Sequence, residues 1–231
     1  MPGLLLCLPA ACSYFRAPII SKPAPELADF IRHQHRLAEI STLTAAATIQ
    51  YESGFETINL TARIDYQAPD TLIALVRDPL SRKLARFKLA GLEYELHLLR
   101  KNEFYSGDRF PEQWLPAPLM FLTPPDLRRL LFGRLPEGIN PAGLKPGARV
   151  PEWSHVSLPV RLILQRDLPV PAEIIFGHSP QPELRILFQE FTRLDDCFLP
   201  AQIIFINDRI PLRITIGFSQ ISAEMVKLVS K

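Results

Sequence analysis

The side chains in this sequence that could bind a metal ion or act as acids, bases or nucleophiles are five histidines, three cysteines and 24 acidic residues. His33 and His35 are two positions apart in a segment with helical periodicity, so they face different ways and make poor co-ligands. His97, His155 and His178 have no cysteine or acidic residue at metal-site spacing. No HExxH, GxSxG or Walker motif is present. The sequence therefore predicts no metal, no cofactor and no enzymatic activity.

The three cysteines, Cys7, Cys12 and Cys197, have neither CxxC spacing nor the number needed for a disulfide framework. Cys197 follows Asp195 and Asp196 between two strand-like segments, which predicts a turn there. No basic cluster lies beside it in the sequence to stabilise a thiolate. We therefore do not expect Cys197 to be a nucleophile.

An uncharged apolar run of nine residues, 3–11, precedes Cys12. It is too short to cross a membrane, but a short apolar segment ending in small residues, here Ala10 and Ala11, is typical of a secretory signal and its cleavage site. The sequence around Cys12 resembles the lipobox of bacterial lipoproteins, in which the signal is removed and the cysteine is acylated. From the residues alone, an apolar N-terminal helix or strand is the alternative.

Two features depart from the lipobox pattern. Pro9 stands where an aliphatic residue is usual, and the basic segment that normally begins a signal is absent. A start codon placed several residues too late would explain the second departure. We predict a signal peptide over residues 1–11, lipid attachment at Cys12, and a tether over residues 12–25.

The length of 231 residues fits one medium domain, which we place at residues 26–231. Apolar residues make up 47% of the chain and charged residues 22%, which is enough to bury a sizeable core. The 26 basic and 24 acidic residues leave a net charge of +2, which argues against a dedicated nucleic-acid binder. With 23 prolines and only 10 glycines, the chain is neither collagen-like nor suited to a glycine-rich nucleotide site.

Two segments are expected to be helical. Residues 25–40 begin with a proline and carry apolar side chains at helical spacing. A second helix is expected after Thr123, which fits an N-cap, because Pro124 and Pro125 then occupy positions whose missing N–H groups cost nothing. Gly133 is expected to end this helix.

Most of the remaining sequence alternates with the period of two that is typical of strands. In residues 56–66, Ile58, Leu60 and Ile64 point to one side, and Gly54 marks a hairpin before them. Counting such runs predicts about ten or eleven antiparallel strands. The expected fold is α+β and mostly β: a curled antiparallel sheet, forming an incomplete barrel lidded by helices. Composition leaves open whether its interior is filled or holds a ligand.

The segments follow one another in a recognisable order: RHQHRLAEI, DTLIALVRDPLSRKLARFKLAG, FYSGD, LLFGRLP and FLPAQIIFINDRIPLRITI. This order, over roughly residues 30–220, resembles the LolA/LolB superfamily and within it is most like the LolB lipoprotein receptors. The resemblance implies a monomeric outer-membrane lipoprotein on the periplasmic face. It also implies that the protein takes acyl chains of lipoproteins from a LolA-like carrier and inserts them into the bilayer.

The resemblance also assigns a membrane-insertion loop. LolB proteins expose the leucine of a Pro-Leu-Gly loop for insertion, and Pro79 and Leu80 match the first two of these residues. Ser81 replaces the glycine, and Arg82 and Lys83 follow it. A leucine folded back onto the sheet is the alternative.

The charge of the residues around this loop is an observation that does not depend on the resemblance. Residues 77–88 carry five basic side chains and one acidic one, in a chain whose net charge is only +2. Such an excess fits a solvated strand face, and it equally fits contact with anionic headgroups.

For an acyl chain, the alternation of the strands and the apolar positions of the second helix suggest a set of inward-facing residues. The candidates are Ile58, Leu60, Ile64, Phe87, Leu89, Leu96, Ile214 and Ile216, with Leu127, Leu130 and Leu131 from the helical lid. Two other functions stay open: a structural or assembly lipoprotein with a filled core and a protein partner, and a periplasmic carrier of free lipid on the same fold.

Overall fold

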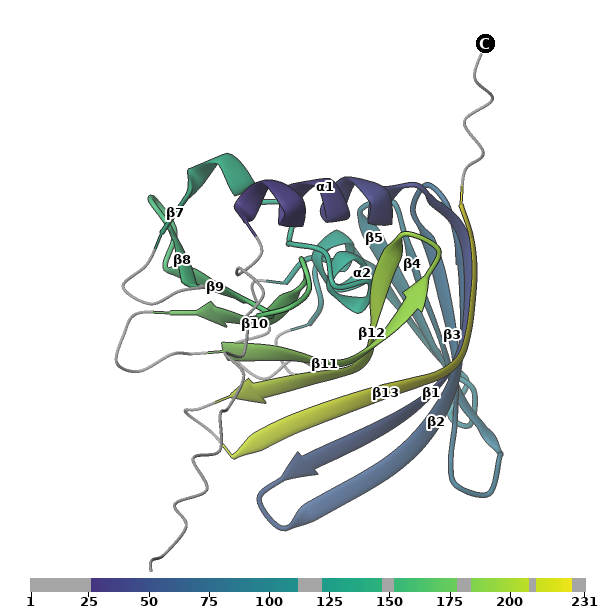
Figure 1. Cartoon of the computed structure of the whole chain (residues 1–231). Coiled ribbons are helices and arrows are strands. Elements are labelled where there is room, and N and C mark those ends of the chain that lie inside the picture. Colours follow the sequence, from purple (N-terminus) through teal and green to yellow (C-terminus); the bar gives the residue numbers. More distant parts are fainter. Residues whose placement is uncertain (1–25, 112–121, 147–151, 178–183, 208–210, 226–231) are drawn as a thin grey trace, which may run out of the picture.

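The structure is a computed structural model and describes residues 26–111, 122–146, 152–177, 184–207 and 211–225 (Figure 1). The predicted signal, Cys12 and tether lie outside the described residues. The first half of the chain forms α1 (Leu27–Ala38), β1 (Ile40–Ser53), β2 (Glu56–Gln67), β3 (Thr71–Arg77), β4 (Lys83–Ala90), β5 (Glu93–Leu98) and β6 (Glu103–Gly107). The second half forms α2 (Pro124–Leu131), a 3-10 turn η2 (Pro141–Gly143), β7 (Leu144–Pro146), β8 (Glu152–His155), β9 (Val160–Leu164), β10 (Pro171–Phe176), β11 (Leu184–Leu194), β12 (Cys197–Asn207) and β13 (Leu212–Met225).

All the described strands join one antiparallel sheet in the order β6-β5-β4-β3-β2-β1-β13-β12-β11-β10-β9-β8-β7. Strands β1 to β6 and strands β7 to β13 each pair in chain order, and the pairing of β13 with β1 joins the two halves, so that β6 and β7 are the two edge strands. The mostly β fold with an antiparallel sheet and helices is confirmed. The sheet is not closed, as an incomplete barrel implies, but the prediction is wrong in two respects: the described sheet has 13 strands instead of ten or eleven, and it is not strongly curled.

The strands missing from the prediction are the shortest ones. Strands β7 and β8 have three and four residues, and they lie in a segment that is interrupted by prolines and glycines. A strand of this length shows too little alternation to be recognised by a period of two. Pairing with β9 and with each other therefore defines these strands, rather than any local pattern.

Helix α2 begins and ends as its sequence predicts. The Thr123 side-chain oxygen accepts a hydrogen bond from the backbone N–H of Asp126 at 3.3 Å, and the Asp126 carboxylate accepts one from the backbone N–H of Thr123 at 3.1 Å. This reciprocal capping box satisfies two N–H groups at the start of the helix. Beyond the C-terminus, Gly133 has a φ of +69°, a conformation that glycine adopts without steric cost.

Helices α1 and α2 lie on the same side of the sheet (Figure 1). On α1, Phe30, His33 and Leu37 are buried. The helix is tied to the segment after α2 by Gln34, whose amide donates to the Gly133 carbonyl at 3.0 Å and accepts from the Leu135 N–H at 2.9 Å. We call the sheet face under these helices the helix-facing side and the opposite face the outer side.

The core fills the space between the helices and the sheet in two adjoining clusters. One cluster includes Phe30 of α1 and Leu130 of α2 with strands β9 to β12, and the other includes Leu37 and Phe132 with strands β1 to β4. Side chains that pack against both clusters are Leu127, Leu131, Ile216 and Phe218. The two helices therefore cover a continuous core.

Because neighbouring strands are antiparallel throughout, their turns fall alternately at two ends of the sheet. Helix α1 leads into the start of β1 and marks the proximal end. The opposite end, which we call the distal end, carries the β1–β2, β3–β4, β5–β6 and β8–β9 turns. Figure 1 shows the β1–β2 and β3–β4 turns pointing away from α1.

Candidate functional site

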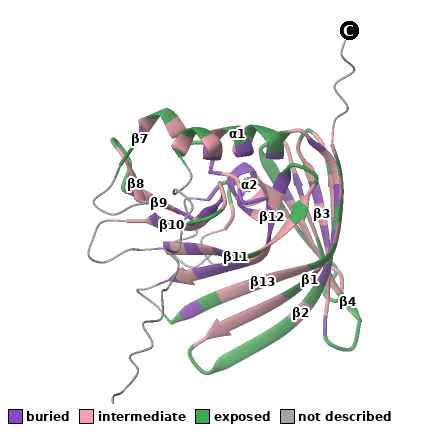
Figure 2. Cartoon of the chain, viewed as in Figure 1, coloured by how far each residue is buried: buried purple, intermediate pink, exposed green. Residues whose placement is uncertain are grey.

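An apolar strip extends the helix-facing side toward the distal end. Pairing places Ile49 opposite Leu60 and Ile216, and Tyr51 opposite Ile58 and Ile214, on the same face as the buried alanines of β1 and β2. These six side chains are only half-buried or exposed, and Ile58 is 43% exposed. Figure 2 shows the distal part of β2 as exposed and that of β1 as half-buried, whereas β13 begins with a buried residue. The apolar face of the sheet thus continues beyond its helical cover.

The predicted acyl-chain residues divide into three groups. Ile64, Leu89 and Leu130 are buried in the core. Six more are half-buried and pack against the clusters, whereas Ile58 and Leu60 lie in the strip outside them. The six are Phe87, Leu96, Leu127, Leu131, Ile214 and Ile216. The structure therefore brings most of this set together, but as packed side chains.

A small pocket lies between the end of α2 and the sheet. It has a volume of about 20 Å³ and is lined by apolar residues that include Leu131, Phe132, Ile64 and Phe218. A volume of this size holds about one water molecule. An acyl chain could enter here only if α2 or the surrounding side chains moved.

Polar contacts hold α2 in its closed position. The Arg128 guanidinium donates to the carbonyl oxygens of Asp70 and Gly91, which lie in the β2–β3 and β4–β5 turns. Arg129 donates to the Leu135 carbonyl at 2.7 Å. The helix is therefore attached to the proximal end of the sheet by backbone acceptors, which can exchange with water if the helix moves.

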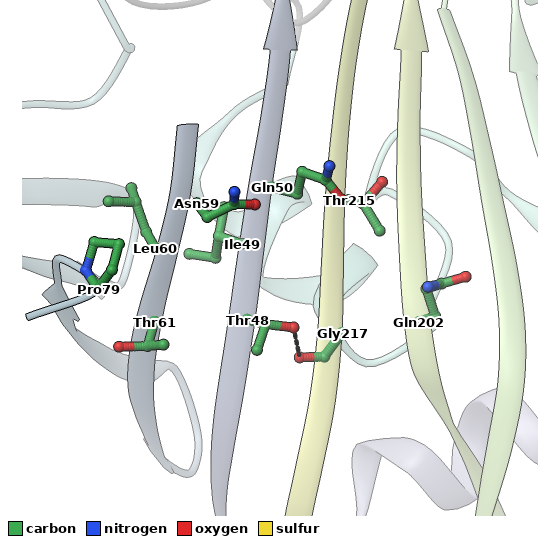
Figure 3. Close-up of a pocket in the computed structure, with 10 residues that line it drawn as sticks. All are labelled: Thr48, Ile49, Gln50, Asn59, Leu60, Thr61, Pro79, Gln202, Thr215 and Gly217. Carbon is green, nitrogen blue, oxygen red and sulfur yellow. Dashed lines mark hydrogen bonds between the residues drawn. The ribbon is translucent and has the colours of Figure 1, made fainter. Parts of the chain in front are cut away.

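A larger pocket of about 310 Å³ opens on the outer side (Figure 3). Its lining includes hydroxyl and amide groups with no charged side chain, and Pro79 and Leu60 border it on one side. The lining residues are Thr48, Ile49, Gln50, Asn59, Leu60, Thr61, Pro79, Gln202, Thr215 and Gly217. Sequence reasoning missed this pocket, because polar residues on alternate strand positions look like an ordinary solvated face. The one local signal is Gly217, whose missing side chain leaves space beside Thr48.

The predicted insertion loop is organised by Asp78. One carboxylate oxygen accepts the backbone N–H groups of Leu80 at 3.0 Å and Arg82 at 2.9 Å. The other accepts the guanidinium groups of Arg82 at 2.6 Å and Arg100 at 2.9 Å. Ser81 completes the turn with a φ of 61°, a left-handed conformation that glycine adopts without steric cost. Sequence reasoning missed Asp78 and Arg100.

The charge of Asp78 is stabilised by its partners. Desolvation raises the pKa of Asp78. The hydrogen bonds from the Arg82 backbone and side chain, the positive charge of Arg82 and the hydrogen bond from the Leu80 N–H together lower it by more, so the pKa lies below its ordinary value. The carboxylate is nearly buried, whereas Leu80 at the tip is 72% exposed. The loop therefore presents an apolar side chain above a turn that is held by the hydrogen bonds and ion pairs of Asp78.

His33 and Cys197 lie where α1 meets β12. The ring Nε2 of buried His33 accepts the Phe198 N–H at 3.0 Å, and desolvation lowers the pKa of His33 to about 4. Cys197 begins β12 and is buried, so its expected place within the turn is corrected by one position. Burial raises the pKa of its thiol. His35 is exposed on another face of α1, as its spacing from His33 predicts.

The described residues contain no group of three or more histidine, cysteine or acidic side chains placed to hold a metal ion. Within the same part of the chain, no helix is both long enough and apolar enough to cross a membrane.

Solved structures share this fold at low sequence identity. A DUF1329 family protein from Desulfovibrio piger superposes with a TM-score of 0.60 and 9% identity, covering 87% of this chain and 92% of that one. A domain named for outer-membrane lipoprotein sorting, from Vibrio parahaemolyticus, gives 0.58 and 10% identity over 89% and 93% of the two chains. A LolA superfamily protein from Nitrosomonas europaea gives 0.54 and 8% identity over 88% and 96%. No protein-family model and no curated protein matches the chain. The chain therefore has the fold of these proteins.

Proposed function

We propose that this protein is an outer-membrane lipoprotein that receives the acyl chains of other lipoproteins from a LolA-like periplasmic carrier and passes them to the bilayer, as LolB receptors do. The observation that carries the proposal is the apolar strip, which runs from the core past its helical cover toward the loop that exposes Leu80. The fold likeness to a lipoprotein-sorting domain and to a LolA superfamily protein supports it.

Binding would require no bond chemistry. Each CH₂ group of an acyl chain that leaves water contributes ~0.8 kcal/mol, so a chain laid along Ile49, Leu60 and Ile216 would gain affinity roughly with its length. Deeper entry requires α2 to move away from the sheet, because the pocket beneath it is only about 20 Å³. The Arg128 contacts to the Asp70 and Gly91 carbonyls are the attachments that would open.

Delivery would follow at the distal end. Leu80 would enter the bilayer while Arg82, Lys83 and Arg100 stay among the anionic headgroups, each worth about 1 kcal/mol near the surface. Acylation at Cys12 would keep the domain at the periplasmic face of the outer membrane. Stable anchoring needs more than one acyl chain, because a single chain gives only marginal membrane binding.

A second function is favoured by one observation. The tight packing beneath α2, with a pocket of about 20 Å³, fits a structural or assembly lipoprotein whose core is permanently filled. Such a protein would act through a protein partner on its surface and would not bind acyl chains.

The two functions are separated by binding of an acyl-chain fluorophore to the full chain. Leu60→Glu places a charge in the strip and should abolish binding, because an unpaired carboxylate is strongly disfavoured beside an acyl chain. Thr61→Glu is the matched control, since Thr61 is exposed on the opposite face of the same strand. Circular dichroism checks that both variants fold. No binding by the wild-type chain would support the filled-core function, and loss in both variants would point to the outer pocket, which both residues line.

A further inference from the structure

The large apolar side chains that the described structure leaves exposed are concentrated in one region of the sheet. Four of the seven lie in or beside the β1–β2, β3–β4 and β5–β6 turns, whereas Leu92 lies in the β4–β5 turn at the proximal end, and Val156 and Leu158 lie between β8 and β9 near the other edge of the sheet (Figure 1). The four are Phe55, Ile58, Leu80 and Phe104. Ordinary exposed leucines and phenylalanines are scattered singly, so this asymmetry indicates a surface with a partner.

Phe55 is the most exposed of them. It lies at the tip of the β1–β2 hairpin, and its side chain is fully exposed. The hairpin is held in place by the Gly54 N–H, which donates to the Pro211 carbonyl at 3.1 Å. A Cβ at Gly54 would meet no atom within 4 Å, so no side chain packs against the hairpin at that position. Phe55 therefore has no packing role in the described structure.

Phe55 and Leu80 occupy neighbouring hairpins. Strands β2 and β3, which connect their turns, pair directly, and both turns point away from α1 (Figure 1). Each apolar tip is on its own turn rather than in one continuous patch. A fluid bilayer surface can accommodate separate protruding side chains at once, whereas a folded protein partner would need a matching pocket for each.

Charge favours an anionic lipid surface as the partner. Arg82 in the β3–β4 turn and Arg100 in the β5–β6 turn both pair with the Asp78 carboxylate, and Lys83 at the start of β4 and Lys101 next to Arg100 add two positive charges near these turns. Phe55 itself is flanked by Glu52 and Glu56 in sequence, and Glu52 lies 4.0 Å from the guanidinium of Arg213. Electrostatic attraction would therefore come from the Leu80 side, and apolar contact from both tips.

We propose that Phe55 is a second membrane-inserting residue, so that the domain docks on an anionic bilayer by two apolar tips, Phe55 and Leu80. This rests on the proposed function, because it concerns the same end of the sheet as the proposed insertion loop. It adds an orientation: the distal end faces the bilayer and α1 faces away. Ile58 and Leu60, which follow Phe55 along β2, then lie between the core and the lipid.

The test introduces a tryptophan at each position of the full chain and measures quenching by brominated phospholipids. The vesicles contain phosphatidylcholine and phosphatidylglycerol in equal parts, and the signal of the native Trp114 and Trp153 is subtracted with wild-type protein. Phe55→Trp should be quenched as strongly as Leu80→Trp. Leu92→Trp is the matched control, since Leu92 is 69% exposed at the opposite end, and it should remain unquenched. Equal quenching at positions 55 and 92, or none at 55, would overturn the proposal.

A second measurement separates docking from acyl binding. Phe55→Ser should slow delivery of a lipoprotein to the same vesicles about tenfold, the factor expected when one large apolar side chain no longer enters lipid. Leu92→Ser should deliver at the wild-type rate. Both should bind an acyl-chain fluorophore normally, because neither residue lies in the strip. Failure of the wild-type chain to bind the fluorophore would remove the proposed function, but it would leave the quenching result to decide the docking surface independently.

Discussion

Apolar side chains are buried in the helix-covered part of the sheet and exposed at its distal end. Under α1 and α2, residues such as Leu89, Leu130 and Ile203 are fully buried, and the pocket between the end of α2 and the sheet is only about 20 Å³. At the distal end, Phe55 and Leu80 project into solvent, and the pocket of about 310 Å³ opens beside Pro79. Stability therefore depends mainly on the first region, which leaves the second free to present apolar side chains to a partner.

The two regions also treat ionisable groups differently. His33 is buried beneath α1 and is held neutral by desolvation, which lowers its pKa to about 4. Asp78 at the distal end is held charged by Arg82 and Arg100. His33 thus avoids the desolvation cost of a buried charge, whereas the charged carboxylate of Asp78 accepts the hydrogen bonds that fix the shape of its turn.

The largest expected effect tests the covered region. Leu130→Ala removes a fully buried side chain of α2 and should lower the free energy of unfolding by ~2–5 kcal/mol, through lost burial and the cavity left behind. Urea-induced unfolding measures this difference. Leu92→Ala, which removes an exposed leucine, should change stability by no more than roughly 0.5 kcal/mol. Similar losses of unfolding free energy in the two variants would contradict the conclusion that stability depends mainly on the helix-covered region.

The next effect concerns pH. The pKa of His33 is lowered in the folded state, so below its unfolded value of 6.5 the unfolded chain binds a proton that the folded chain does not. Stability should therefore be fully present above pH 6.5 and should fall by ~3 kcal/mol as the pH drops toward about 4. Urea unfolding across this range measures the loss. In His33→Gln the decrease should be smaller by about this amount, and an unchanged pH dependence would assign it to other groups.

Local patterns predicted what local interactions determine. The capping of α2 from Thr123, its end before Gly133, and the β1–β2 hairpin at Gly54 all followed from residues a few positions apart. The alternation of Ile58, Leu60 and Ile64 likewise gave their common face, because the period of a strand is fixed by its backbone.

The features that could not be predicted from the sequence depend on contacts between residues far apart in the chain. The burial of His33 depends on Phe198, 165 positions away, and the shape of the Leu80 loop depends on Arg100 in the next hairpin. The outer pocket is formed by four strands and Pro79, each of which contributes residues that look ordinary alone. The curling of the sheet was overestimated for the same reason, since alternation does not specify how far a sheet curls.

A smaller effect is expected from the charge at the distal end. Because the pKa of Asp78 is lowered in the folded state, its carboxylate stabilises the loop at neutral pH, and this contribution is lost as the pH falls through the folded value. Asp78→Asn should loosen the loop at neutral pH in the same way. Amide hydrogen exchange at Leu80 and Arg82, relative to intrinsic rates, measures the change. The melting temperature should hardly alter, and a large decrease would mean that the loop supports the core.

The smallest expected change in stability belongs to the residue with the clearest predicted role. Leu80→Ala removes a side chain that is 72% exposed, so the free energy of unfolding should stay within roughly 0.5 kcal/mol of the wild-type value. Leu80→Glu should also fold, because Asp78 and its hydrogen bonds, rather than Leu80, shape the turn. It places a charge where an apolar side chain would enter lipid, so it should still accept an acyl-chain probe and yet fail to deliver a lipoprotein to vesicles. Leu92→Glu, an equally exposed leucine at the proximal end, should do both normally. Delivery by folded Leu80→Glu at the wild-type rate would remove Leu80 from the mechanism, and a large drop in its melting temperature would place Leu80 with the covered region instead.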